Sequence, residues 1–237
     1  MAKVPDPTSH LEPMGLSLGE ENIYYHRHLP HYHPPEATLF VTFRLKGSLP
    51  ASVVEELRQE ESIRLKRADS NASVEGTTSG DPKAIDEQFN RFDVFLDAGV
   101  YGPNWLGEDR VAKLVKEAIH FRDGKVYDLQ AYCIMPNHVH LVFVGRNDIP
   151  TYRILQSLKR HTARMANRAL GRPGAFWQDE SYDHVVRDGE ELERVLWYVL
   201  NNPVKAGLVS DWKAWPWSYC KPDLVEMEIG SPAGSNG

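Results

Sequence analysis

The sequence predicts a single globular domain that combines strands with helices. The chain has 237 residues, of which 41% are hydrophobic and 25% are charged, and this suits an ordinary domain with its own core. Short β-branched and aromatic segments alternate with longer segments whose apolar residues recur at helical spacing. Only two cysteines occur, and we see neither a secretory signal nor an apolar run of about 20 residues that could span a membrane. We therefore expect a cytoplasmic protein without a membrane partner.

In the first half of the chain, the sequence predicts one strand, two helices around a loop, and one further helix. Residues 37–45 (ATLFVTFRL) are β-branched and aromatic and lie between Pro-Pro and Gly-Ser, which is typical of a strand. Residues 48–67 and 85–96 are predicted as helices, with the Ser-, Gly- and Thr-rich residues 69–82 as a flexible loop of an insertion. Residues 109–121 place apolar side chains at helical spacing and are predicted as a helix.

In the second half, the sequence predicts a hairpin, two helices and one further strand. Residues 125–134 alternate in part, and the sequence MPN separates them from residues 138–145, which is typical of a hairpin. Residues 152–170 have an apolar face and are predicted as a long helix. Residues 182–186 are predicted as a short strand, and residues 188–201 as a helix with acidic residues in its first turn.

Two histidines in the second hairpin strand form the sharpest chemical feature. Alternation along a strand directs His138 and His140 to the same face, where two imidazoles can share a metal ion. Imidazole suits Zn²⁺, Mn²⁺ and other divalent ions, whereas Mg²⁺ usually takes more oxygen ligands. The alternative is a pair of ordinary histidines on a half-buried strand, and the spacing by itself does not decide between the two.

A tyrosine and an asparagine in the last predicted helix form the second feature. Tyr198 and Asn202 are four residues apart, so one helix face can present both. A phenol beside a metal-bound phosphate can act as a nucleophile, and the amide oxygen of Asn202 is a ligand that a divalent ion accepts. The alternative is that Tyr198 packs in the core and that Asn202 and Pro203 merely end the helix, because proline prevents its simple continuation.

A basic segment stands out in a chain whose formal net charge is −6. That overall charge argues mildly against a nucleic-acid partner, so any such argument has to be local. Residues 151–178 contain no acidic residue, and their basic residues are Arg153, Lys159, Arg160, Arg164, Arg168 and Arg172. From Arg160 onward the arginines recur every four residues on one helix face, which suits a row of DNA phosphates. A merely solvated face is the alternative.

Several other residues invite a functional interpretation that we do not favour. The aromatic residues downstream could stack on unpaired bases, although packing is the default for them; they are Trp177, Tyr182, Trp212, Trp215 and Trp217. A histidine-rich tract, HRHLPHYH, could bind metal, but prolines interrupt and follow it. Cys133 is expected to be a small buried hydrophobic residue.

The order and spacing of several segments resemble the REP-associated tyrosine transposases, which belong to the HUH superfamily of single-strand transposases. The two most specific segments are AYCIMPNHVHL (131–141) and YVLNNPVKAGLV (198–209). Further similar segments are HLPHYHPPEATLFVTFRL (28–45), LQSLKRHTARMANR (155–168), FWQDESYDHVVRD (176–188) and WPWSY (215–219). Together they cover roughly residues 25–219, and the resemblance does not extend to the start of the chain or to its end.

The resemblance implies an α+β fold, a ferredoxin-like βαββαβ antiparallel sheet with an added C-terminal helix that carries the catalytic tyrosine. Residues 25–219 would form this single domain, and residues 48–107 an insertion after the first strand. Residues 1–24 are expected to be a loose leader and residues 220–237 a flexible tail.

The resemblance also implies a chemistry for the candidate residues. His138 and His140 would hold a divalent metal ion, Mg²⁺ or Mn²⁺, with Asn202 as the third ligand. Tyr198 would attack a DNA phosphodiester, which gives a 5′-phosphotyrosine and a free 3′-hydroxyl and lets strands rejoin without ATP. The substrate would be single-stranded DNA beside a REP-like hairpin, with its backbone held by Lys159, Arg160, Arg164 and Arg168.

Two other functions remain open at this point. A protein derived from a transposase could bind hairpin DNA without cleaving it. A metal-dependent hydrolase could use the two histidines and a water molecule, in which case Tyr198 would be dispensable. The chain could act as a monomer or as a homodimer that exchanges its tyrosine helix.

Overall fold

The protein folds around one antiparallel sheet of five strands. The computed structural model describes residues 37–55, 59, 63, 94–96, 101–147 and 149–225. The strands lie in the order β4-β1-β3-β2-β5, and every pairing between neighbours is antiparallel. Their bounds are Thr38–Leu45 (β1), Tyr127–Ile134 (β2), His138–Gly145 (β3), Trp177–Val186 (β4) and Ser218–Cys220 (β5).

The first four strands and two helices confirm the predicted ferredoxin-like core. Helix α3 (Asp109–Arg122) connects β1 with β2, and α4 (Thr151–Leu170) connects β3 with β4. This is the order β-α-β-β-α-β, and the order β4-β1-β3-β2 in the sheet is the one expected for this α+β fold. Helix α5 (Gly189–Lys205) and the edge strand β5 are additions to the core.

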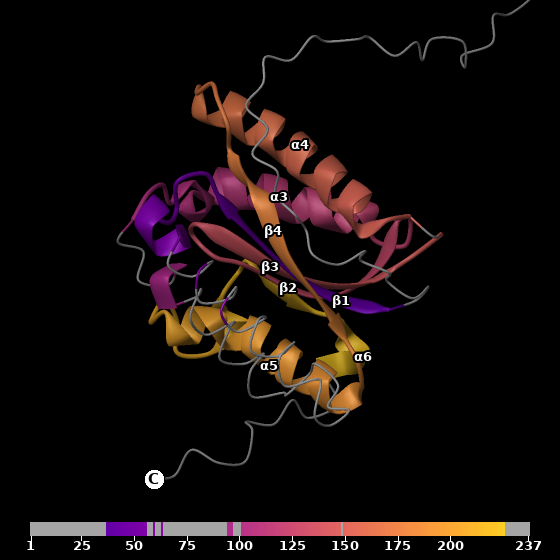
Figure 1. Ribbon diagram of the computed structural model, residues 1–237. Helices are drawn as coiled ribbons and strands as arrows, with labels where there is room; N and C mark the ends of the chain where they lie inside the picture. The colour runs from indigo at the N-terminus through magenta and orange to yellow at the C-terminus, as the bar shows by residue number, and fades with distance from the viewer. Residues whose placement is uncertain are drawn as a thin grey trace, which may run out of the picture. The chain divides into compact units, whose positions relative to one another are not determined.

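The sheet separates two layers of helices. Helices α3 and α4 cover one face, and α5 covers the other (Figure 1). Because side chains alternate along a strand, Val139 and Leu141 of β3 enter the core beneath α3 and α4. Val142 enters the core beneath α5 together with Phe40 of β1. The same alternation directs His138 and His140 to the α5 face.

Helix α5 is longer than the sequence predicts. It runs through Pro203 and ends at Lys205, so the prediction that Pro203 prevents its continuation is wrong. Proline removes one backbone donor, but the ladder resumes directly after it, where the Ala206 N–H donates to the Asn202 carbonyl at 3.0 Å. A proline so near the end of a helix costs one hydrogen bond, and the neighbouring turn keeps the helix in register.

The end of the described chain is also more ordered than the sequence predicts. The boundary between domain and tail was expected after residue 219, but β5 extends to Cys220 and the short helix α6 (Pro222–Val225) follows. Strand β4 begins at Trp177, five residues before its predicted start at 182. These segments were missed because β5 and the first half of β4 owe their conformation to pairing with β2 and β1.

Only parts of the predicted insertion can be compared with the structure. Residues 51–55, 59 and 63 are helical within the helix predicted at 48–67, and residues 94–96 are helical within the one predicted at 85–96. The leader, the loop at 69–82 and the histidine-rich tract lie outside the described residues. Among the helices that the structure describes, none combines the length and apolar character needed to cross a membrane.

Candidate active site

Strand β3 carries the two histidines at the centre of the site. Both imidazoles are fully buried, with 0% of their surface exposed, on the face of the sheet that α5 covers. The rings face each other so that Nε2 of His138 lies 2.9 Å from Nε2 of His140. Two ring nitrogens that point at one another need a proton or a cation between them, since two lone pairs repel.

The outer nitrogen of each ring is held by a polar neighbour. His138 Nδ1 lies 2.7 Å from Asn137 Oδ1, which can only accept, so His138 donates from Nδ1 and keeps Nε2 as an acceptor. The Asn137 amide is oriented by its own donation to the Leu96 carbonyl at 2.8 Å. His140 Nδ1 lies 2.8 Å from Oγ1 of Thr42, its cross-strand partner on β1. Such contacts fix ring orientation and the nitrogen left for a ligand.

The donor set of this site fits a divalent ion. Two nitrogens bound at about 2.1 Å and at right angles to each other would lie about 3.0 Å apart, close to the observed 2.9 Å. Burial lowers the pKa of both imidazoles, that of His138 to about 3, so both favour the neutral form that binds metal. The described residues contain no cluster of three or more His, Cys, Asp or Glu that could hold a metal. Besides the two imidazoles, amide, water and phosphate oxygens are ligands that such an ion accepts.

Helix α5 brings Tyr198 to the histidines. The Tyr198 ring centroid lies 5.6 Å from that of His140 and 6.1 Å from that of Phe40, in both cases edge to face. The Tyr198 hydroxyl oxygen is buried. The apolar stripe of α5, with Val199 and Leu200 buried against the sheet, holds the helix in this rotation. The histidines and the tyrosine thus come from one chain and meet between the sheet and α5.

Asn202 lies on the same face of α5, one turn after Tyr198. The residue is fully buried, with 0% exposed, and its Oδ1 is shielded from solvent. A buried amide oxygen at this position is a suitable third ligand for an ion held by the two imidazoles.

Two basic residues lie near this cluster. Arg44 of β1 is the cross-strand partner of His138 and therefore lies on the same face of the sheet. Lys205, in the last turn of α5, holds its ammonium 4.5 Å from the centroid of the Tyr198 ring.

The first turn of α5 is anchored to β4. Glu191 is only 5% exposed, and its Oε1 lies 2.9 Å from His184 Nε2. Its Oε2 accepts from the Arg187 N–H at 2.6 Å, while the Glu191 N–H donates to the N-cap Asp188 at 2.8 Å. Capping together with this tie to the sheet fixes the direction in which the helix, and with it Tyr198, leaves β4.

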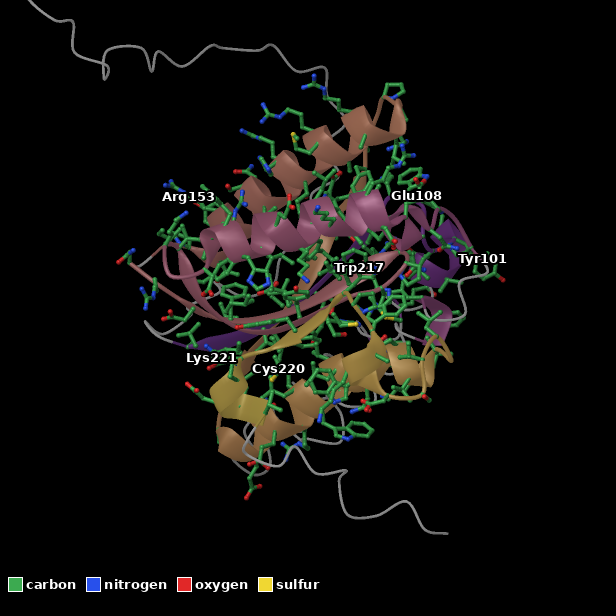
Figure 2. The ribbon with its side chains drawn as sticks, turned by 180° about the vertical axis from the view of Figure 1, so that it is seen from behind. Tyr101, Glu108, Arg153, Trp217, Cys220 and Lys221 are labelled. Atoms are coloured by element: carbon green, nitrogen blue, oxygen red, sulfur yellow. The ribbon has the colours of Figure 1, made fainter. Side chains whose placement is uncertain are left out.

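The predicted DNA-binding residues do not join this cluster. Arg160, Arg164 and Arg168 are exposed on α4, and α4 packs on the face of the sheet opposite the histidines, with Leu158 and Ala166 in that core. In Figure 2, Arg153 marks the α4 layer, whereas Cys220, at the end of the edge strand β5, belongs to the core beneath α5.

Two other basic residues of this segment have structural contacts. Lys159 donates to the Asp179 carbonyl at 2.9 Å and to Ser181 Oγ at 3.0 Å, which ties α4 to β4. Its predicted contact with DNA stays a prediction. Arg172 departs from the arginine stripe, because its guanidinium lies 3.7 Å from the centroid of the Trp105 ring.

Trp177, Trp215 and Cys133, which the sequence predicts to pack rather than to bind DNA or metal, have the expected structural contacts. Trp177 is 4% exposed, and its Nε1 donates to Thr162 Oγ1 at 2.9 Å. Trp215 Nε1 donates to the Ile134 carbonyl at 3.0 Å, at the end of β2. Cys133 is buried in the core beneath α5.

Sequence reasoning missed several contributors to the site. Thr42 lies at an alternating position of a correctly predicted strand, but its contact with His140 depends on which strands pair. The His184–Glu191 pair likewise joins separate elements. Lys205 is seven residues after Tyr198, and this helical spacing was a usable signal that the expected helix end at Pro203 concealed.

Comparisons with known proteins find matches that include the part of the chain with the two histidines and Tyr198. The family model "Transposase IS200 like" matches residues 104–202, a span that contains both histidines, Tyr198 and Asn202. A protein of Haemophilus influenzae described as a REP-associated tyrosine transposase is 32% identical over 153 residues, which cover 57% of this chain and 86% of that relative. The REP-associated tyrosine transposase of Escherichia coli K12 is 23% identical over 111 residues, 45% of this chain and 62% of that relative.

A solved structure described as the REP-associated tyrosine transposase bound to a REP hairpin aligns over 80% of each chain, with a TM-score of 0.44 and 15% identity. On the identity and coverage of the Haemophilus influenzae relative, this chain belongs to the family of REP-associated tyrosine transposases.

Proposed function

We propose that this protein is a metal-dependent endonuclease and strand transferase that cleaves single-stranded DNA beside a REP-like hairpin. The observation that carries the proposal is the juxtaposition of Tyr198 with His140, whose Nε2 lies 2.9 Å from that of His138. A nucleophile that can bond to phosphorus thus lies beside a pair of ligands for a divalent ion. The name of the family supports the choice of a REP-like hairpin.

In the proposed reaction, the Tyr198 oxygen bonds to the scissile phosphorus and the bond from phosphorus to the 3′ oxygen breaks. The phenol, whose ordinary pKa is about 10, gives its proton to water, and the departing 3′ oxygen takes one up. The products are a 5′-phosphotyrosine and a free 3′-hydroxyl. Because the phosphodiester energy is retained in the linkage, attack by another 3′-hydroxyl rejoins strands and releases the tyrosine.

The surrounding residues prepare this step. His138, His140 and Asn202 would hold a divalent ion, Mg²⁺ or Mn²⁺. When bound, such an ion polarises the scissile phosphate and offsets the charge that develops on it. Asn137 and Thr42 orient the imidazoles, and Phe40 contacts the Tyr198 ring from β1.

The basic face of α4 is proposed to hold DNA away from the reacting phosphate. Arg160, Arg164 and Arg168 are exposed along one side of this helix, and no acidic residue occurs between positions 151 and 178. Because α4 and the histidines lie on opposite faces of the sheet, the stripe would contact a different part of the substrate, such as the hairpin stem. Action on chromosomal DNA would place the protein in the cytoplasm, associated with the nucleoid.

The proposal is tested by incubating labelled hairpin oligonucleotides, with single-stranded flanks, with the protein and Mn²⁺ or Mg²⁺. Products are separated on a denaturing gel. We expect a metal-dependent protein-linked band for the wild type that is absent in Tyr198→Phe and His138→Ala. Tyr101→Phe is the matched control, because it removes the same hydroxyl from an exposed position distant in sequence from the histidines.

Each other outcome favours a different function. Free cleavage products that persist in Tyr198→Phe would identify water as the nucleophile and the protein as a hydrolase. A retained gel shift without cleavage under either metal would favour the hairpin-binding protein that does not cleave DNA.

A further inference from the structure

The continuation of α5 through Pro203 has a chemical consequence at Lys205. Tyr198, Asn202 and Lys205 are separated by four and then three residues, so an unbroken helix places all three on one face. The Lys205 ammonium lies 4.5 Å from the Tyr198 ring centroid. Lys205 is exposed while Asn202 is buried, so along this face Lys205 is the residue nearer to solvent, where a DNA backbone can arrive.

Lys205 and His140 share Tyr198 as a neighbour. The Lys205 ammonium lies 4.5 Å from the centroid of the Tyr198 ring, and that centroid lies 5.6 Å from the centroid of the His140 ring. A cation in this neighbourhood would weaken the binding of a dication by the candidate ligands, because like charges repel. That cost is removed when an anion lies between the two cations, and a phosphodiester is the anion that the proposed reaction supplies.

A purely structural role for Lys205 would look different. A lysine in the last turn of a helix is favoured by the negative end of the helix dipole, and this accounts for a cation at the position. The dipole does not account for the ammonium lying over the ring of the candidate nucleophile. If the dipole were the whole explanation, loss of the charge would alter stability and leave the cleavage chemistry intact.

We propose that Lys205 is a catalytic residue of this site, whose ammonium contacts a non-bridging oxygen of the scissile phosphate and stabilises the charge that develops as Tyr198 attacks. Lys205 keeps its proton throughout, so the bonds and protons balance as described above. The proposal rests on the proposed function and adds to it a residue that binds the reacting phosphate.

The test measures single-turnover formation of the protein–DNA adduct at saturating hairpin DNA, with affinity measured separately by gel shift. Lys205→Gln removes the charge and keeps much of the length. We expect its adduct rate to fall on the order of 10²-fold, as for the loss of one donor to a developing oxyanion, with the dissociation constant changed less than about threefold, since one phosphate contact among several is lost. Lys205→Arg should recover part of the rate.

Lys213→Gln is the matched control. Lys213 also holds its ammonium beside an aromatic ring, 5.8 Å from the centroid of Trp212, and its substitution removes the same charge. A second readout uses substrates with sulfur at one non-bridging position of the scissile phosphate. The slowing caused by sulfur at the position that Lys205 contacts should be smaller in Lys205→Gln than in the wild type, because that contact is already lost.

The outcomes separate this proposal from the one on which it rests. A wild type that forms no adduct overturns both. A wild type that forms the adduct, with Lys205→Gln equally fast, overturns the role of Lys205 alone. A slow Lys205→Gln whose two sulfur effects equal those of the wild type also overturns the phosphate contact, because it assigns the loss to a structural change.

Discussion

The two faces of the sheet bury different kinds of side chain, although the same strands form both faces. Beneath α3 and α4, the strands contribute an apolar core that includes Val41, Phe43 and Leu141. Beneath α5, the same strands bury polar groups, with His138 and His140 fully enclosed. Strand alternation alone makes this division possible, since neighbouring residues of β3 serve opposite layers.

The two layers also differ in where they carry positive charge. The α4 layer presents it outward, on the exposed Arg160, Arg164 and Arg168. The α5 layer carries Lys205 beside the half-buried ring of Tyr198, which in turn contacts the buried imidazole of His140. The exposed arginines of α4 are suited to binding several DNA phosphates along a surface. Lys205 of α5 is suited to binding the one phosphate that lies next to Tyr198. A protein that cuts a selected phosphodiester needs both, and the sheet keeps the two apart.

The sharpest test of this division asks whether the α5 layer of one chain suffices for catalysis. Tyr198 lies against His140 of the same chain, so mixing Tyr198→Phe with His138→Ala should recover no adduct, because neither protein holds a complete site. The measurement is adduct formation in the mixture on a denaturing gel. Wild type mixed with Tyr198→Phe is the control, and adduct there should scale with the wild-type fraction. Recovery of adduct between the two inactive variants would instead show that tyrosine helices are exchanged in a homodimer.

The buried histidines should make the α5 layer sensitive to acid. Burial lowers the pKa of His138 and His140 in the folded protein, whereas in the unfolded chain the value is about 6.5. The unfolded state thus binds more protons as the pH falls below about 6.5, and each histidine lowers stability by roughly 1.4 kcal/mol per pH unit until its folded pKa is reached.

The measurement is urea unfolding of the metal-free protein between pH 7 and pH 4.5. The double variant His138→Gln, His140→Gln should show a flatter dependence, and His161→Gln, which removes an exposed histidine of α4, should follow the wild type. Equal slopes in the wild type and the double variant would contradict the effect of burial.

Much of the fold follows from local sequence patterns. The strands β1 and β3, the helices α3 and α4, and the shared face of His138 and His140 all follow from composition, flanking residues or periodicity within one segment. The ferredoxin-like order of the strands was expected from resemblance, and the topology confirms it. The remaining features depend on partners distant in sequence: Thr42 meets His140 because β1 pairs with β3, and β5 exists as a strand because it pairs with β2.

The candidate site was predictable in the same way as the fold: the residues within one segment could be selected, but the contacts between segments could not. Alternation on a strand and spacing on a helix selected His138, His140, Tyr198 and Asn202 as two separate pairs, and their approach depends on how α5 crosses the sheet. The general rule that proline ends a helix hid Lys205 from the sequence prediction, although α5 continues through Pro203 to Lys205. The orientation of His138 by Asn137 also depends on Leu96, which lies 41 residues earlier.

The support of His140 by β1 should be measurable as metal affinity. Thr42→Val keeps the size of the side chain and removes the oxygen that lies 2.8 Å from His140 Nδ1. Loss of such a supporting contact typically weakens metal binding by about 10–100-fold, which calorimetric titration with Mn²⁺ would measure. Thr38→Val is the matched control, because Thr38 lies on the same strand and face and is paired with Val144 instead. Equal affinities in the two variants would remove Thr42 from the site.

The smallest expected effect belongs to the α4 layer. Arg164→Ala removes one exposed charge, so hairpin affinity should fall only a few-fold, and the dependence of log affinity on log salt should flatten by about 0.7–0.9 for one lost phosphate contact. The adduct rate at saturating DNA should not change, because Arg164 lies on the opposite face of the sheet from Tyr198. Lys113→Ala removes an equal charge from the exposed side of α3 in the same layer, and it should leave the salt dependence unaltered.

If both variants weaken binding equally, the layer attracts DNA through its overall field, and the arginine stripe has no specific role. If Arg164→Ala instead slows the adduct step, the two faces are not separate in function, because DNA held on α4 must then help to place the scissile phosphate beside Tyr198.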